Sequence, residues 1–137
     1  MIQFRPIPPA DVEAIWGFVR PGLEQIIRRT GEKWSPSHIV QALHENRAAL
    51  FVCDDGFVVL QRLVEDWTSE PYINVWAMWF MPGRARKKRK ELVAWLDDTS
   101  TKFGCRIWKF GSPRMGWSAM EDNEMEIERV IWRRKTK

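Results

Sequence analysis

The sequence predicts one α/β domain of the α+β type over residues 1–137, with a mixed, mainly antiparallel sheet and helices on both faces. Three observations predict this fold. Apolar residues recur at helical spacing through the first third of the chain. Short apolar runs separated by turn residues follow between positions 48 and 81, which is typical of hairpin-linked strands. A long helical pattern then leads to another apolar run, as in a crossover to a parallel strand.

The N-terminal third is expected to begin with a strand over residues 1–7 and to continue with two helices. Asp11 can cap the first helix, whose apolar residues recur every three or four positions. Pro21 and Gly22 are expected to interrupt it, because proline lacks an N–H and glycine is a weak helix former. The second helix is therefore predicted over residues 23–29.

A third helix is predicted to begin after Ser35, a favoured N-cap residue that proline follows, and to end near Asn46. Strands over residues 48–53 and 57–65 come next. The residues between them, Asp-Asp-Gly at 54–56, are expected to form a hairpin turn in which glycine accepts a positive φ.

The strand predicted over residues 72–81 is apolar on both sides apart from Asn74, so we expect it at the centre of the sheet with a layer on each face. Strict alternation along this strand would place Trp76 and Trp79 on opposite faces. Both tryptophans are expected to pack in the core.

The C-terminal half is predicted to contain a long helix over residues 84–103, a stop at Gly104 and a strand over residues 105–110. A short helical segment through Trp117 and a last strand over residues 125–132 are expected to follow.

Composition and charge narrow the classes of function. The net charge of +4 permits contact with nucleic acid or another polyanion. Cys53 and Cys105 lie in apolar runs and are expected to be reduced and buried, and the sequence shows no metal-ligand spacing. The chain has no signal-peptide pattern and no apolar stretch long enough for a membrane span, so we expect a cytoplasmic protein.

The most informative segment is the start of the long helix, which carries six cations within seven positions. Cations there oppose the helix dipole and repel one another, and a bound anion would relieve both effects. A solvated polar face is the alternative explanation. The six cations are Arg84, Arg86, Lys87, Lys88, Arg89 and Lys90.

The element order and the segment from Val75 to Arg84, followed by Phe103 to Trp108, resemble the GNAT family of N-acetyltransferases. In that family, a strand ending in an apolar-x-Pro run leads into Arg/Gln-x-x-Gly-x-Gly/Ala, and the following helix N-terminus receives the pyrophosphate of acetyl-CoA. The resemblance implies a GNAT fold and acetyl-CoA as the cofactor if the protein is active. The residues it assigns to the cofactor or another anion are Met81, Gly83, Arg84, Ala85, Arg86, Lys87 and Lys88.

The chain departs from the family pattern at two points. Ala85, Lys87 and Arg89 stand at the glycine positions when Arg84 is matched to the family's arginine. No aspartate or glutamate lies in residues 72–81, and the single tyrosine precedes the crossover instead of following it. The resemblance therefore assigns no catalytic residue.

Three functions follow from these features. A basic start to this helix in place of the glycine loop is similar to that of degenerate GNAT-like proteins of short-tailed phages, which implies a non-catalytic virion or assembly protein. Such a protein would bind other virion or assembly proteins and reside in the host cytoplasm or the virion. An active acetyl-CoA-dependent N-acetyltransferase and a nucleic-acid-binding module are the alternatives. Candidate partner-binding residues are Arg89, Lys90, Trp117 and Trp132.

Overall fold

The computed structural model describes residues 2–84, 88–111, 128 and 133–136. The segment expected to be helical through Trp117 and the strand expected over residues 125–132 fall outside that part of the chain. The elements in order are β1 (Arg5–Ile7), a 3-10 turn (Pro9–Asp11), α1 (Val12–Thr30), α2 (Pro36–His44), β2 (Ala49–Cys53), β3 (Gly56–Val64), β4 (Pro71–Phe80), α3 (Arg89–Lys102) and β5 (Trp108–Phe110).

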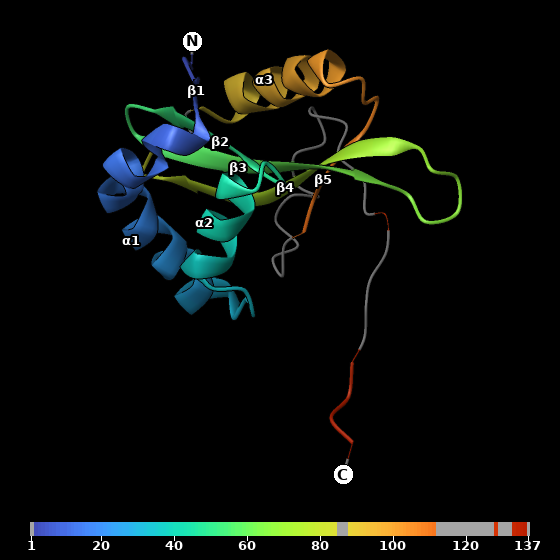
Figure 1. The fold of residues 1–137 in the computed structure, drawn as a ribbon, viewed down its shortest axis with the longest axis horizontal. Coiled ribbons are helices and arrows are strands. Elements are labelled where there is room, and N and C mark those ends of the chain that lie inside the picture. The colour runs from blue at the N-terminus through green and yellow to red at the C-terminus, as the bar shows by residue number, and fades with distance from the viewer. Residues whose placement is uncertain (1, 85–87, 112–127, 129–132, 137) are drawn as a thin grey trace.

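The described strands form one five-stranded sheet in the order β1-β2-β3-β4-β5. Every neighbouring pair is antiparallel except β4 and β5, which are parallel and joined by α3. Helices α1 and α2 cover one face of the sheet, and α3 covers the other (Figure 1). The predicted mixed sheet with helices on both faces and the crossover to a parallel strand are therefore confirmed.

Each face of the sheet has its own apolar core, because alternate strand residues point to opposite sides. Leu60 and Ile73 pack with Leu96 of α3 on one side. Val59 and Phe57 pack with Leu23 of α1 on the other. β4 contributes to both cores, which confirms its predicted place inside the sheet.

The predicted break at Pro21 and Gly22 is wrong, since α1 runs through both residues as one helix. Gly22 packs against the rings of Trp79 and Phe57 on the sheet, and a Cβ atom on it would come 2.9 Å from Cδ2 of Trp79. Val19 and Leu23 are fully buried on either side of it. Packing of this apolar stripe outweighs the hydrogen bond that a proline removes from the helix.

The turn between β2 and β3 forms as predicted, but the reason given for its glycine is wrong. Gly56 does not have a positive φ. It pairs with Phe80 across the sheet, and a Cβ on it would come within 2.4 Å of both the Trp79 carbonyl oxygen and Phe80 Cδ1. Gly56 is needed because β3 and β4 approach too closely there for a side chain.

Two expectations about composition can be compared with the described residues. Cys53 and Cys105 are buried and free, as expected. No helix in the described part of the chain is both long and apolar enough to cross a membrane.

Candidate functional site

The central strand β4 is interrupted by a β-bulge. Val59 pairs with Ala77 and Leu60 pairs with Val75, so Trp76 is an extra residue on β4 with no counterpart on β3. A bulge shifts the side-chain alternation by one residue. Trp76 therefore packs on the same face as Trp79, against the core under α1 and α2, and the prediction that these two tryptophans face opposite ways is wrong.

The bulge also marks the place where β4 separates from β5. The parallel pairing joins Ile73 to Trp108 and ends where Val75 meets Phe110. Beyond this point β4 continues to Phe80 with no described strand along its outer edge. Strand edges of this kind present backbone N–H and C=O groups that an extended ligand can use.

The open half of β4 leads into a tight turn. The Arg84 N–H donates to the Met81 carbonyl at 3.0 Å, and the Met81 N–H donates to the Asp55 carbonyl at 2.7 Å. Gly83 has φ of 82°, which favours glycine, and a Cβ on it would meet no atom within 4 Å. This turn therefore leaves the side of Gly83 open. Met81, Gly83 and Arg84, which the resemblance assigned to an anion site, lie together in this turn and are exposed.

The helix that follows begins later than predicted, at Arg89 and not at residue 84. The left-handed Gly83 turn stops residue 84 from being the first helical residue. Arg89 and Lys90 occupy the exposed first turn of α3. Ala85, Arg86, Lys87, Trp117 and Trp132 lie outside the described residues.

Lys88, the N-cap residue of α3, is held by a carboxylate that is distant in sequence. Its Nζ lies 2.7 Å from Oδ2 of Asp55, whose other oxygen accepts from the Cys53 thiol at 3.4 Å. The hydrogen bond from Lys88 lowers the pKa of Asp55, and the same bond raises the pKa of Lys88. Burial raises the pKa of Cys53. Lys88 was predicted to face an anion, but in the structure its charge is neutralised by Asp55.

The N-terminus of α3 has the electrostatics of an anion site. Its N-cap residue, Lys88, makes no side-chain capping hydrogen bond, and its first-turn N–H groups carry the positive end of the helix dipole. Arg84 precedes it and Arg89 opens it. These groups match the charge of the acetyl-CoA pyrophosphate, and the space beside Gly83 gives a phosphate room to approach the backbone. The residues present therefore fit the group that the resemblance implies.

A polar row crosses the sheet two residues before the bulge. Gln61, Asn74 and Lys109 are register neighbours on β3, β4 and β5. The apolar neighbours Leu60, Ile73 and Trp108 belong to the core under α3, so the three polar side chains point to the opposite face. The Asn74 side-chain nitrogen donates to Oε1 of Gln61 at 3.0 Å.

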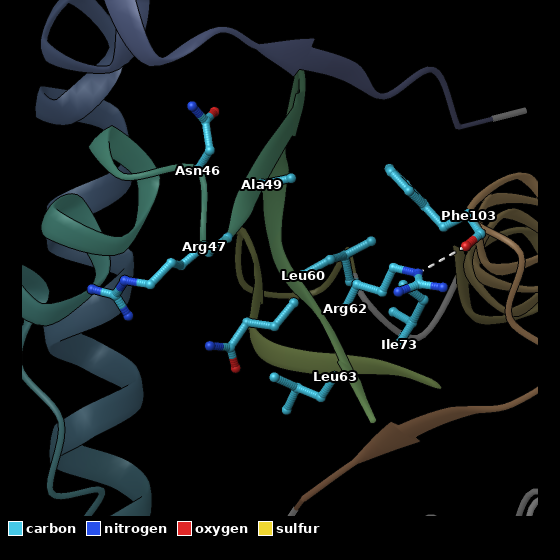
Figure 2. Close-up of a pocket in the computed structure, with 10 residues that line it drawn as sticks. Asn46, Arg47, Ala49, Leu60, Arg62, Leu63, Ile73 and Phe103 are labelled. Carbon is cyan, nitrogen blue, oxygen red and sulfur yellow. Dashed lines mark hydrogen bonds between the residues drawn. The ribbon is translucent and has the colours of Figure 1, made fainter. Parts of the chain in front are cut away.

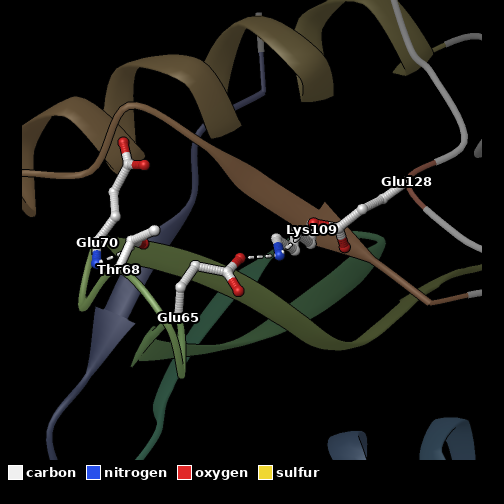
Figure 3. A network of polar contacts seen from close by, with 5 residues as sticks. All are labelled: Glu65, Thr68, Glu70, Lys109 and Glu128. Atoms are coloured by element: carbon white, nitrogen blue, oxygen red, sulfur yellow. Dashed lines mark hydrogen bonds and ion pairs between the residues drawn. The ribbon is translucent and has the colours of Figure 1, made fainter.

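Lys109 joins this row to two carboxylates (Figure 3). Its ammonium donates to Glu65, at the end of β3, and to Glu128, at 2.6 Å from Oε1. It also lies 4.3 Å from the centroid of the Tyr72 ring. The hydrogen bonds to Glu128 and then to Glu65 raise the pKa of Lys109. The ammonium therefore holds two carboxylates together near Tyr72, on the face of the sheet that carries the polar row.

This cluster was not predicted from the sequence. The prediction concerned carboxylates of the central strand, whereas Glu65 and Glu128 reach the site through tertiary contacts. One signal was present: Lys109 interrupts a parallel strand that should be apolar on both faces. A lysine at such a position is expected to pair with a carboxylate or to take part in a functional site.

Comparison with known proteins supports the fold assignment. No family profile matches the sequence, and no curated protein is similar to it. The fold is similar to that of the ribosomal-protein-alanine N-acetyltransferase from Brucella melitensis biovar Abortus 2308, with a TM-score of 0.69, 14% identity and 100% of both chains covered. A GCN5-related N-acetyltransferase from Ralstonia eutropha JMP134 has a TM-score of 0.69 at 13% identity, covering 98% of this chain and 99% of that one.

An aminoglycoside N-acetyltransferase solved with CoA, AAC(6')-Iy, has a TM-score of 0.59 at 22% identity, covering 98% of this chain and 100% of that one. At these identities the likeness concerns the fold alone. The chain has the fold of the GNAT acetyltransferases, as its sequence predicted.

Proposed function

We propose that the protein is an acetyl-CoA-dependent N-acetyltransferase of the GNAT type. The observation that carries this proposal is the end of β4–β5 pairing at Val75, directly before the bulge at Trp76. Beyond this point β4 offers a strand edge to an extended ligand, and the turn that follows β4 leads to the N-terminus of α3, which favours an anion.

The chain's own residues would hold the cofactor at two points. The backbone of β4 between the bulge and Phe80 would pair with the amide groups of its pantetheine arm. Arg84 and the first-turn N–H groups of α3 would bind its pyrophosphate, with the space beside Gly83 admitting a phosphate. Bound acetyl-CoA supplies an activated acetyl thioester.

The acceptor amine would approach from the face that carries the polar row. An amine must lose its proton to attack the thioester carbonyl, and the cluster of Glu65 and Glu128 around Lys109 provides the carboxylates on that face. We assign Glu65 as the general base, positioned by Lys109. A C–N bond would form as the C–S bond breaks, the sulfur would leave as the CoA thiolate, and the amine proton would pass to the carboxylate of Glu65.

Turnover of acetyl-CoA with a panel of primary amines tests the proposal. Glu65→Gln should lower kcat about 10²- to 10⁴-fold, because the amide cannot accept the amine proton. Glu45→Gln is the matched control, since Glu45 pairs with Arg47 in the exposed turn before β2. An equal rate for both variants would remove Glu65 from the mechanism, and no turnover with any amine would reject the enzyme assignment.

A second candidate is the non-catalytic role in a tailed phage. Arg89 favours this non-catalytic role. It is the exposed first residue of α3, at a position where the GNAT pattern has a glycine. In this role the basic segment binds other virion or assembly proteins, or a polyanion such as nucleic acid, in the host cytoplasm or the virion. Co-purification with virions supports this role, and absence from particles and assembly intermediates contradicts it.

A further inference from the structure

The turn between β2 and β3 contacts the segment that joins β4 to α3 at two points, both through Asp55. The carbonyl oxygen of Asp55 accepts from the Met81 N–H at 2.7 Å, directly after β4 ends at Phe80. The carboxylate of Asp55 lies 2.7 Å from the Nζ atom of Lys88, the N-cap residue of α3. One residue therefore holds the chain both where it leaves the sheet and where it enters the helix.

Asp55 itself has little freedom to move. It is 8% exposed. The carboxylate oxygen that does not face Lys88 accepts from the Cys53 thiol at 3.4 Å. Cys53 pairs with Gly56 across the turn, and Gly56 pairs with Phe80 of β4. Because both carboxylate oxygens have a partner and the strands on either side fix the turn, Asp55 is a rigid point of attachment.

The other end of α3 is also attached to the sheet (Figure 2). Arg62 of β3 donates from Nε to the carbonyl oxygen of Phe103, the C-cap residue, at 3.1 Å, beside a cavity of about 460 Å³. Between the two ends, Leu92 and Leu96 are buried in the core under α3. Loss of the contact between Asp55 and the N-cap residue would therefore loosen the first turn of α3 without detaching the helix.

The two points that Asp55 holds precede the two groups proposed to bind the cofactor's pyrophosphate. The turn at Gly83, with Arg84, follows the first point, and the first-turn N–H groups of α3 follow the second. A phosphate can contact both groups at once only if they lie at a suitable distance from each other. A site in which they are already held in place binds more tightly, because the ligand does not have to order them.

The charge of Asp55 does not oppose an anion at this site. A carboxylate near an anion would normally repel it, but Lys88 offsets this charge. In return, Asp55 offsets a cation that would otherwise oppose the helix dipole at the N-cap position. The pair is therefore nearly neutral to an approaching anion, while Arg84 and Arg89 are exposed to it.

We propose that Asp55 is a positioning residue of the acetyl-CoA site, which holds the Gly83 turn against the first turn of α3 through Met81 and Lys88; this role rests on the proposed function. Two other roles for the ion pair lead to different results. A pair that only stabilised the fold would leave the affinity of the folded protein for acetyl-CoA unchanged. If Lys88 bound the phosphate directly, Asp55 would compete for it, so Asp55→Asn would tighten binding.

Calorimetric titration with acetyl-CoA, at a temperature where every variant is folded, separates these roles. Asp55→Asn combined with Lys88→Met keeps the net charge and should raise the dissociation constant about tenfold, because the ligand must then order the first turn of α3. Asp98→Asn combined with Lys102→Met is the matched control, since it removes an exposed ion pair of 3.0 Å from the same helix, and it should leave the constant unchanged. Asp55→Asn alone should also weaken binding. Unchanged or tighter binding by this single variant, or equal constants for the two double variants, would overturn the proposal.

Turnover kinetics give a second readout that a loss of stability alone would not produce. With a primary amine as acceptor, the double variant at Asp55 and Lys88 should have a raised KM for acetyl-CoA and an unchanged KM for the amine. An enzyme that had only lost stability would show a lower kcat and the same KM for both substrates. That pattern would contradict a positioning role.

Amide hydrogen exchange tests the attachment without any ligand. The Val93 N–H, which in an α-helix bonds to the carbonyl of Arg89, should exchange about tenfold faster in the double variant at Asp55 and Lys88 than in the control. Equal exchange rates would overturn the positioning role even where acetyl-CoA binds. Absence of acetyl-CoA binding by the unmodified protein would instead reject the proposed function, and the exchange rates would still decide whether Asp55 holds the start of α3.

Discussion

A methyl group on Gly56 has no room in this fold. The Cβ of Gly56→Ala would come 2.4 Å from the carbonyl oxygen of Trp79 and 2.4 Å from Cδ1 of Phe80. Phe80 could rotate, but the Trp79 carbonyl belongs to the ladder between β3 and β4 and cannot move without separating the strands. Overpacking a core typically destabilises by about 1–3 kcal/mol, and we expect about 3 kcal/mol here because a backbone atom must move.

The assay is urea unfolding, with Gly17→Ala as the matched control. Gly17 lies in α1, and a Cβ there meets nothing within 4 Å, so alanine should raise the free energy of unfolding by about 0.5–1 kcal/mol. Gly56→Ala should also lower the melting temperature by roughly 10 °C in a domain of this size. A free energy of unfolding within about 0.5 kcal/mol of the unmodified value would refute the steric argument.

Three further predictions concern packing and charge. Leu96→Ala, in α3 at 1% exposure, should destabilise by about 2–5 kcal/mol in urea, and a loss below about 1 kcal/mol would mean that α3 packs loosely. Asp55 has a lowered pKa, so it stabilises the fold above its ordinary value of 3.8, and this contribution is lost as pH falls through the folded pKa. Asp55→Asn should therefore flatten the fall in stability below pH 3.8, and an unchanged slope in acid unfolding would contradict this. Lys109→Met leaves its two carboxylate partners adjacent and unpaired, so the variant should lose stability at neutral pH and recover part of it on acidification; a pH-independent loss would argue against their pairing.

The sequence predicted the elements whose signals are local. Ser35 is the N-cap residue of α2 as expected, and the Nδ1 atom of His38 accepts the Ser35 N–H at 2.9 Å in a reciprocal cap. The apolar pattern on both sides of β4 placed it inside the sheet. The helix between the last two described strands predicted the parallel pairing, because a crossover is the usual way to make one.

The errors arose where tertiary packing overrides local preference. Pro21 stays within α1 because the flanking side chains are fully buried. The bulge at Trp76 has no marker in the sequence, since no glycine or proline accompanies it, yet it reverses the facing of every residue after it. Strict alternation of side chains along a strand, which has a period of two residues, cannot predict such a shift.

In the candidate site, the cations near α3 could be predicted from the sequence, but their carboxylate partners could not. The cations near α3 form a run in the sequence, so their clustering could be seen directly. The pairing of Lys88 with Asp55 and of Lys109 with Glu65 joins residues more than thirty positions apart. Charge neutralisation at the first pair, and a carboxylate cluster at the second, follow only from the arrangement of β2, β3 and β5.

Calorimetric titration with acetyl-CoA at low and moderate salt measures whether the open edge of β4 and the turn at Gly83 bind this cofactor. We expect saturable binding that survives moderate salt. Arg84→Ala should weaken it about tenfold, while Arg28→Ala, which removes an equal charge from α1, should leave it unchanged. Absence of binding, or binding that moderate salt abolishes equally in all three proteins, would exclude a cofactor site here and favour the non-catalytic role.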